Sequence, residues 1–450
     1  MPVFTRASEL EAPQEDVARW HARRGAFERL VPPWQSVSRT DDDDVAEGSI
    51  ARLRLHAGPL SLPWDARHED VAFPHRFVDV QERGPFRSWR HEHVFEARGA
   101  KTLLTDRVTY ELPLDPLSRI GDSVVVRMLS RLFDYRHRVT RDDVRAHASH
   151  DRAPLRVAVT GASGLVGRAL VPYLTTGGHD VVRLVRHAPT RDDERAIDFS
   201  APSARAFDDT DAVVHLAGAP IAEGRFDEAH RRAIRTSRVD ATRALARALA
   251  DLKNAPRVVV SSSAIGFYGD RGDEVLDERS ARGDGFLADV CAEWEAAWAP
   301  AEDAGIRVVK LRTGVVLSPS GGALRKLLPP FRAGLGGPIA DGRMYMSTIA
   351  LDDLLDVVLR ALTDDRLVGP VNAVGPEPLT NAQFSSTLAR VLRRPCLFRV
   401  PRAALTTVFG DMARETLLAS QRVVPRALTD VGHTFRFDTV EEALRHVLGR

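Results

Sequence analysis

The sequence contains few cysteines, no excess of either charge and no long apolar run. Its two cysteines, Cys291 and Cys396, exclude a framework of several disulfides and predict a reducing, cytoplasmic location. The 63 basic residues match the 62 acidic ones, so no basic field favours nucleic acid or an anionic membrane as a partner. No secretory signal and no apolar stretch of about 18 residues is present. At roughly 100–200 residues per domain, the 450 residues predict two or three globular domains.

A glycine-spaced turn is the most informative segment. Residues 156–167 read RVAVTGASGLVG, which predicts a buried strand, a turn and the start of a helix. Gly161, Gly164 and Gly167 allow the bend, leave room for a pyrophosphate and let the helix pack closely on the strand. The helix N-terminus, beginning near Leu165, then directs free N–H groups at the phosphates. The segment predicts a dinucleotide site, with an ordinary tight turn as the alternative.

The end of the next strand indicates which dinucleotide is bound. The strand predicted over residues 180–186 ends in Arg186 and His187, where NAD-specific proteins place an acidic residue for the ribose hydroxyls. An arginine there suits the 2′-phosphate of NADP. We therefore predict NADP as the cofactor. The alternative is that Arg186 is a solvated charge at a strand end.

The texture of the sequence changes near residue 150. Before the polar segment 149–154, alternating stretches predict strands over 49–56, 86–95 and 101–112 and a helix from about 122, as in an α+β domain. After it, strands alternate with helices, which predicts an α/β fold with a Rossmann-type parallel sheet and a helical C-terminal segment. The predicted domains are residues 1–150, 155–395 and 396–450.

Two features lie on predicted strands. His91 and His93 share one strand face and raise a metal hypothesis, but His68 and His75 show no ligand spacing. A polar cluster on a pocket wall or the sheet surface is therefore the favoured interpretation, and no metal site is predicted. The strand over 257–263 ends in three serines, at the carboxyl edge where parallel sheets bind ligands.

Several segments carry a family resemblance. From residue 155 onward the chain resembles the extended short-chain dehydrogenases/reductases, and among them an epimerase-like group sometimes labelled cell-division inhibitors. The N-terminal part resembles START-like (SRPBCC) domains, helix-grip folds that hold an apolar ligand. The segments that carry the dehydrogenase resemblance are TGASGLVG (160–167), LAGAPIA (216–222), TSRVDATRAL (236–245), FLADVCAEWE (286–295), LRTGVVL (311–317), GGALRKLLPPFRAGLGG (321–337), GPVNAVGPEPLTN (369–381) and SQRVVPRAL (420–428). The segments that carry the START-like resemblance are RLVPPW (29–34), GPFRSWRHEHVF (84–95) and DRVTYELP (106–113).

The resemblance implies roles at individual positions. Arg186 would face the 2′-phosphate, Ser263 (or Ser262) would hydrogen-bond a substrate oxygen, and Tyr268 would face the substrate pocket. At the pyrophosphate it implies Gly161, Ser163, Gly164, Leu165 and Val166, and the glycine spacing adds Gly167. At the adenosine ribose it implies Leu216, Ala217 and Gly218.

One departure from the family concerns the catalytic pair. Active members place a tyrosine, the general acid/base, four residues before a lysine that lowers its pKa. The chain has five tyrosines and only four lysines, and no tyrosine has a lysine four residues further on. The helix that should hold the pair reads FLADVCAEWE (286–295).

Three functions remain open from the sequence. The first is an NADP-dependent oxidoreductase or epimerase of a small molecule, with Tyr268, Cys291 or Glu293 as an unconventional acid/base. The second is an NADP-binding sensor or regulator without turnover, coupled to an apolar-ligand domain. The third is a carrier of an apolar ligand, with the other domain acting on it or reporting redox state. Neither the substrate nor the oligomeric state is predicted.

Overall fold

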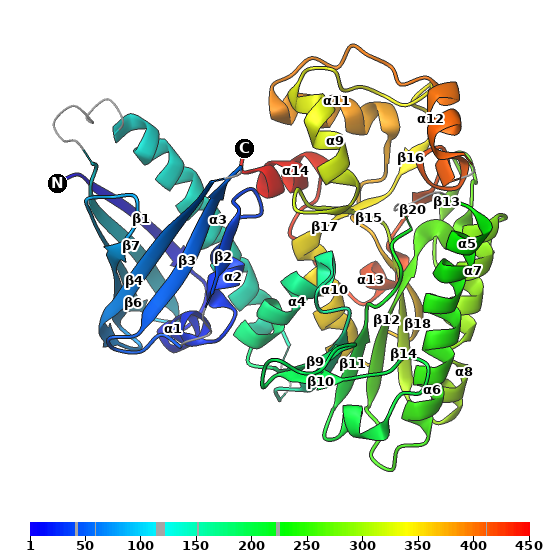
Figure 1. Cartoon of the computed structure of the whole chain (residues 1–450), viewed down its shortest axis with the longest axis horizontal. Coiled ribbons are helices and arrows are strands. Elements are labelled where there is room, and N and C mark those ends of the chain that lie inside the picture. Colours follow the sequence, from blue (N-terminus) through cyan, green and yellow to red (C-terminus); the bar gives the residue numbers. More distant parts are fainter. Residues whose placement is uncertain (41–43, 59, 114–121, 151–152, 222–225, 411) are drawn as a thin grey trace. The chain divides into compact units, whose positions relative to one another are not determined.

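The chain forms two compact units. The first comprises Met1–Asp151 with Pro172–Gly178 and Gly449, and the second holds the rest. The expected linker at 151–152 and Ala222 of the 216–222 motif lie outside the described residues. The computed structural model describes residues 1–40, 44–58, 60–113, 122–150, 153–221, 226–410 and 412–450 (Figure 1).

The first unit is a curved antiparallel sheet with a long helix, as the helix-grip resemblance implies. Its seven strands follow the order β1-β7-β6-β5-β4-β3-β2, in blue to cyan in Figure 1. Their side chains alternate between buried and exposed, as expected for a sheet with one covered face. The bounds are β1 Val3–Leu10, α1 Gln14–Ala22, α2 Ala26–Leu30, β2 Val37–Arg39, β3 Ile50–Ala57, β4 Leu60–Ala72, β5 Arg76–Arg83, β6 Ser88–Arg98, β7 Lys101–Glu111 and α3 Asp122–Ala148.

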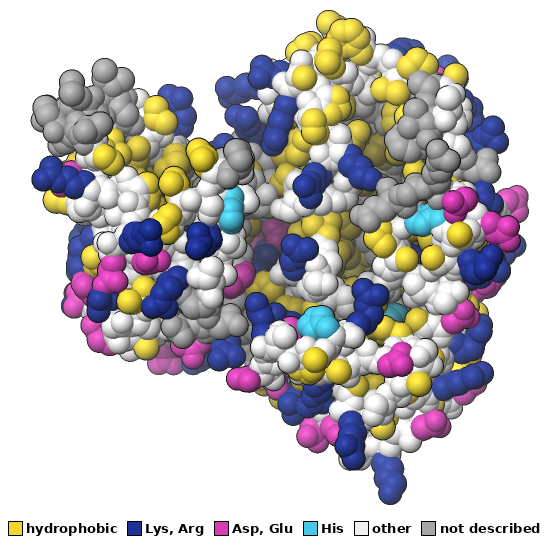
Figure 2. All heavy atoms as spheres, in the orientation of Figure 1, with side chains coloured by type: hydrophobic (Ala, Val, Ile, Leu, Met, Phe, Trp, Pro, Cys, Tyr) yellow, Lys and Arg dark blue, Asp and Glu magenta, His cyan; other side chains and the backbone are white. Residues whose placement is uncertain are grey.

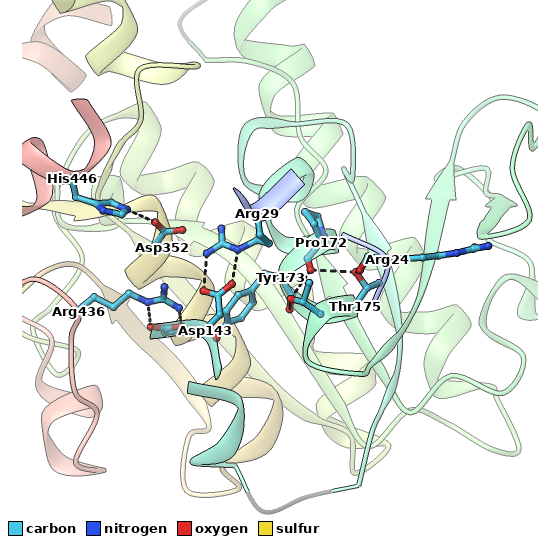
Figure 3. A network of polar contacts seen from close by, with 11 residues as sticks. Arg24, Arg29, Asp143, Pro172, Tyr173, Thr175, Asp352, Arg436 and His446 are labelled. Atoms are coloured by element: carbon cyan, nitrogen blue, oxygen red, sulfur yellow. Dashed lines mark hydrogen bonds and ion pairs between the residues drawn. The ribbon is translucent and has the colours of Figure 1, made fainter. Parts of the chain in front are cut away.

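Helix α3 supplies much of this unit's core. It runs for 27 residues and begins at Asp122, close to the start that the sequence indicated. Leu129 and Phe133 pack with Trp89 and Tyr110 of the sheet. A buried ion pair also joins α2 to α3: the Arg29 guanidinium donates two hydrogen bonds, of 2.7 and 2.8 Å, to the Asp143 carboxylate (Figure 3).

The second unit contains a parallel sheet of the Rossmann type. Its order is β10-β9-β8-β11-β12-β14-β18, and each neighbouring pair is parallel. The first strand, β8, lies between β9 and β11, so the chain reverses its direction of travel there and leaves a crevice at the carboxyl ends of both strands. The bounds are β8 Arg156–Thr160, α4 Leu165–Thr176, β9 Asp180–Val185, β10 Glu194–Ala196, β11 Ala212–His215, α5 Glu228–Arg235, α6 Ala241–Ala250, β12 Val258–Ala264, α7 Phe286–Ala296, α8 Ala299–Asp303, β14 Arg307–Thr313 and β18 Gly369–Ala373.

The C-terminal elements share a core with earlier helices. Apolar side chains of α9, α11 and α14 form one buried cluster. At its edge, His446 Nε2 lies 2.8 Å from a carboxylate oxygen of Asp352 (Figure 3). The bounds are β13 Val275–Leu276, β15 Val315–Leu317, α9 Gly322–Arg332, β16 Tyr345–Met346, β17 Thr348–Ala350, α10 Leu351–Thr363, β19 Leu379–Thr380, α11 Asn381–Leu392, α12 Arg402–Phe409, β20 Arg422–Val423, α13 Arg426–Asp430 and α14 Val440–Leu448.

One continuous helical stretch changes its winding along its length. Helices α5 and α6 are joined by a π-helical turn, Thr236–Asp240. A π turn holds one more residue than an α turn and is often found at functional sites. Here it buries Arg238 and Val239.

The visible surface carries both signs of charge. Figure 2 shows Lys and Arg side chains interspersed with Asp and Glu, in keeping with the formal net charge of +1. Among the described residues, no helix combines the length and hydropathy needed to span a bilayer.

Candidate functional site

The glycine turn lies against the end of a neighbouring strand. Gly161 has φ +70°, and a Cβ added there would lie 2.9 Å from the backbone nitrogen of Ala217. The Thr160 hydroxyl accepts a hydrogen bond of 3.1 Å from the Leu216 N–H, which fixes the segment after β11 beside the turn. Only glycine fits this contact, because any side chain would strain the backbone and collide with the segment.

The rest of the turn suits a pyrophosphate. At Gly167 a Cβ would lie 2.3 Å from the Gly161 carbonyl oxygen, so α4 packs directly on the turn. At Gly164, by contrast, the one neighbour within 4 Å is that same oxygen, at 3.2 Å, and both Gly164 and Ser163 are exposed. Helix α4 begins at Leu165, where the first N–H groups of a helix have no intrahelical partner. The turn therefore fits the phosphates of a dinucleotide.

A cavity of about 240 Å³ extends from the first turn of α4 to the serine-rich end of β12. Apolar side chains, such as Ile221, Leu287 and Val290, make up much of its wall. The predicted site residues that line it are Val166, Leu216, Ala217, Gly218, Ser262 and Ser263.

A buried polar network lies behind Ser263. Its Oγ donates a 2.7 Å hydrogen bond to Glu295 Oε1. Arg312 donates to both oxygens of that carboxylate, each at 2.8 Å, and a third bond of 3.0 Å to the Tyr268 hydroxyl. The sheet register explains the cluster, because Ser263 of β12, Arg312 of β14 and Asn372 of β18 are cross-strand partners.

Tyr268 differs from its expected position. Its side chain is fully buried and does not line the cavity. The hydroxyl donates to Asn372 Oδ1 at 2.7 Å and accepts from Arg312. Burial raises the pKa of Tyr268 above its usual value. The structure thus places Tyr268 as a support for Arg312, and its assignment as a catalytic residue stays a prediction without a geometric basis.

The sequence analysis expected the family pair on α7, and this helix carries Cys291 and Glu295. Cys291 lines the cavity, and burial raises the pKa of its thiol to about 12. Four residues later, Glu295 pairs with Arg312. Glu293 is instead 41% exposed and lies 3.3 Å from Arg235. The sequence analysis missed Glu295, although it lies in the segment 286–295 where the family pair was expected.

A second missed residue is Arg238, in the π turn. It lines the cavity and is 9% exposed, with its guanidinium 5.2 Å from the Trp294 ring centroid. A Cβ on Gly218 would lie 3.3 Å from Arg238 Cζ. Burial lowers the pKa of Arg238. In the described part of the chain no carboxylate pairs with this guanidinium, so it is available to an anion in the cavity.

Arg186, which we predicted to bind the 2′-phosphate, is open to solvent. Arg186 follows β9 directly and is exposed. This position agrees with a role at the outer edge of a nucleotide site, and the role itself stays a prediction.

Family comparisons agree with both units. Residues 157–374 match the "NAD dependent epimerase/dehydratase family". Residues 10–134 match "Polyketide cyclase / dehydrase and lipid transport", and residues 400–447 match a domain of unknown function.

Individual relatives extend this likeness. A Mycobacterium tuberculosis epimerase family protein is 42% identical over 65% of this chain and 98% of its own length. A structure described as a nucleoside-diphosphate sugar epimerase from Corynebacterium glutamicum is 38% identical, with a TM-score of 0.82 over 99% of this chain and 90% of its own. Human epimerase family protein SDR39U1, solved with NADPH, is 32% identical, with a TM-score of 0.60 over 65% of this chain and 99% of its own.

The fold and the site define a protein with an NAD(P)-binding Rossmann fold joined to a START-like antiparallel domain. With the identities just given, the chain belongs to the epimerase family of extended short-chain dehydrogenases/reductases, as the sequence resemblance indicated.

Proposed function

We propose that the second unit is an NADP(H)-dependent oxidoreductase or epimerase acting on a small molecule. One observation carries this proposal: the cavity beside the glycine turn ends at Ser263, whose hydroxyl is already bonded to the Glu295 carboxylate. A hydroxyl with a carboxylate behind it can take a proton from a bound substrate and pass its own proton on.

The chain's own residues then handle the proton. Ser263 Oγ accepts the proton of a substrate hydroxyl while its own proton moves to Glu295 Oε1, and both steps reverse when a carbonyl is reduced. Arg312 holds the carboxylate in place through two hydrogen bonds. Ser262, which lines the same cavity, hydrogen-bonds the substrate oxygen. When bound, the nicotinamide supplies the hydride chemistry.

Three observations support NADP as the cofactor. Arg186 follows the second strand of the sheet, where the 2′-phosphate of NADP is usually bound. Arg238 adds a buried cation beside Gly218. The human relative was solved with NADPH.

A sensor or regulator without turnover is the second candidate. The replacement of the tyrosine–lysine pair favours it, and so does the largely apolar cavity wall. In this candidate the Ser263–Glu295–Arg312 network holds the end of β12 in place and moves no proton.

Turnover separates the two candidates. The wild-type protein would be incubated with NADP⁺ and a panel of nucleoside-diphosphate sugars, with the sugar products separated by chromatography, because epimerisation leaves no net change in the nicotinamide. It would also be incubated with NADPH and a panel of aldehydes and ketones while nicotinamide absorbance is followed. We expect Glu295→Gln to reduce the rate by about 10²–10⁴-fold and to leave NADPH affinity within about threefold. Glu293→Gln, on the same helix but solvent-exposed, is the matched control.

The opposite results are equally informative. A Glu295→Gln variant with the wild-type rate would contradict the proton relay. Tight NADPH binding without turnover of any compound in either panel would favour the regulator.

A further inference from the structure

A second cluster of chemically active side chains lies in the first unit. Strand register brings it together, because His68 pairs with Asp79, Asp79 with His91, and His93 with Asp106 on four adjacent strands, β4 to β7. The three histidines and Asp106 are buried, and Asp79 is partly buried. The sequence analysis placed such a cluster at a pocket wall or on the sheet surface and gave His68 no part in it. The structure buries most of the cluster, which excludes an exposed sheet surface, and it includes His68.

Three donor atoms of the cluster converge. Asp79 Oδ2 lies 3.1 Å from His93 Nε2 and 3.6 Å from His91 Nδ1. One donor atom from each of Asp79, His91 and His93 falls within 4.8 Å of the other two. Donors bound to one tetrahedral zinc ion at about 2.0–2.1 Å are roughly 3.3 Å apart, so these separations need little adjustment to hold an ion.

The other ring nitrogens of both histidines meet one carboxylate. Asp106 Oδ1 lies 2.7 Å from His91 Nε2 and 2.8 Å from His93 Nδ1. Metal-bound histidines almost always donate their second N–H to a carboxylate or carbonyl, which fixes the tautomer and turns the free lone pair toward the metal. Asp106 stands in that position for His91, whereas His93 Nδ1, although 2.8 Å from Asp106 Oδ1, has no aligned hydrogen-bond partner.

Outer residues hold the two carboxylates. His137 Nε2, from α3, lies 2.6 Å from Asp106 Oδ2. His68 Nδ1 lies 2.7 Å from Asp79 Oδ1, which leaves the other Asp79 oxygen directed at His91 and His93. Both carboxylates are thus held by outer histidines, as outer residues orient the ligands of many metal sites.

We propose that the first unit binds one divalent transition-metal ion of the zinc class through His91 Nδ1, His93 Nε2 and Asp79 Oδ2. Two imidazoles and a carboxylate suit borderline ions such as Zn²⁺ or Fe²⁺ better than Ca²⁺ or Mg²⁺. Three protein ligands leave a fourth position for water or a substrate atom, as in catalytic rather than structural zinc sites.

Access and charge are compatible with this site. The Asp79 side chain is 21% exposed, against 4% for His91 and 6% for His93, so Asp79 marks the side on which an ion can enter. Arg136 of α3 interacts electrostatically with both carboxylates. With Arg136 and a divalent ion set against two carboxylates, one positive charge remains, which favours hydroxide or an anionic ligand at the fourth position.

The experiment uses the full chain, stripped with a chelator and titrated with Zn²⁺. We expect one ion per chain by elemental analysis and calorimetry, and visible absorption bands of a coordinated ion when Co²⁺ replaces Zn²⁺. His93→Asn and Asp79→Asn should weaken binding by more than about a hundredfold, and Asp106→Asn by about 10–100-fold. His56→Asn, an exposed histidine of β3, is the matched control and should bind as the wild type does.

The alternative is a network held by protons alone, in which a charged His93 lies between the two aspartates. Failure of the wild-type chain to bind Zn²⁺ or Co²⁺ would overturn the proposal, and so would unchanged affinity in His93→Asn. If the variants do not fold, the wild-type stoichiometry and the Co²⁺ spectrum decide, because a four-coordinate site and loosely held surface ions absorb differently.

Discussion

The two units each bury a polar network, and the two networks balance their charge differently. In the second unit, Glu295 accepts two hydrogen bonds from Arg312, so each charge has its counter-charge inside the protein. In the first unit, Asp79 and Asp106 are surrounded by imidazoles, whose charge depends on what they bind. The second network is complete in itself, whereas the first needs protons or a metal ion.

Both networks are nevertheless built in the same way. A row of cross-strand partners brings polar side chains together on one face of a sheet: Ser263, Arg312 and Asn372 in parallel strands, and His68, Asp79 and His91 in antiparallel ones. Register is fixed by the apolar pattern along whole strands, so such rows keep their alignment as long as the sheet stays folded.

The Gly164→Val substitution is expected to give the largest difference between the two units in ligand binding. The branched side chain occupies the open face of the turn, where the nearest atom to an added Cβ is 3.2 Å away, so NADPH binding should fall below detection. Fluorescence titration of NADPH measures this loss. Ala201→Val, on an exposed loop, is the control. Zn²⁺ uptake should be unchanged, and retained NADPH affinity would show that the turn does not hold the phosphates.

The next largest effect tests the claim that the second network is internally balanced. Arg312→Met leaves the Glu295 carboxylate buried without its partner and should lower the free energy of unfolding by about 3–5 kcal/mol. The double variant Arg312→Met with Glu295→Met should recover most of that loss. Urea unfolding of both single variants and the double variant measures the coupling, and strictly additive losses would contradict it.

Bound ions should stabilise the first unit alone. At a free Zn²⁺ concentration of a hundred times Kd, stability rises by about 2.7 kcal/mol. Hydrogen exchange read by mass spectrometry should then slow in β5, β6 and β7. NADPH should instead slow exchange around residues 160–168 and 216–218. Zn²⁺ protection confined to the second unit would place the ion elsewhere.

The smallest effect concerns the choice of dinucleotide. Arg186→Ala should weaken NADPH binding about tenfold, or about 1.4 kcal/mol, and leave NADH binding nearly unchanged, because NADH has no 2′-phosphate. Parallel titrations with the two cofactors make NADH the internal control. Equal losses for both would remove the 2′-phosphate assignment.

Local patterns allowed much of this protein to be predicted. The turn glycines, the strand before them and the serines at the end of β12 stand within short segments, so the strand–turn–helix and the end of β12 could be located from local patterns. The same holds for the alternation that indicated the antiparallel strands. In both cases the information lies between residues that are close in the chain.

The polar networks could not be read in that way. Glu295 and Arg312 are 17 residues apart, and His137 is 31 residues from Asp106. Their contacts depend on strand register and on where a helix crosses the sheet, neither of which can be read from a short segment of the sequence. Tyr268 illustrates the converse case: the family resemblance implied a side chain facing the pocket, and in the structure this side chain is fully buried and does not line the cavity.

The π turn at Thr236–Asp240 determines which way the side chains of α6 point around the helix axis. It accommodates an additional residue within an otherwise continuous helix, and the side chains after it are rotated relative to those before it. Each residue of an α-helix turns the chain by about 100°. Deletion of Thr236, which is exposed, would therefore return the helix to a uniform winding and swing Arg238 to another side. The cavity would lose its buried cation because the helix rotates about its axis, with every other amino acid retained.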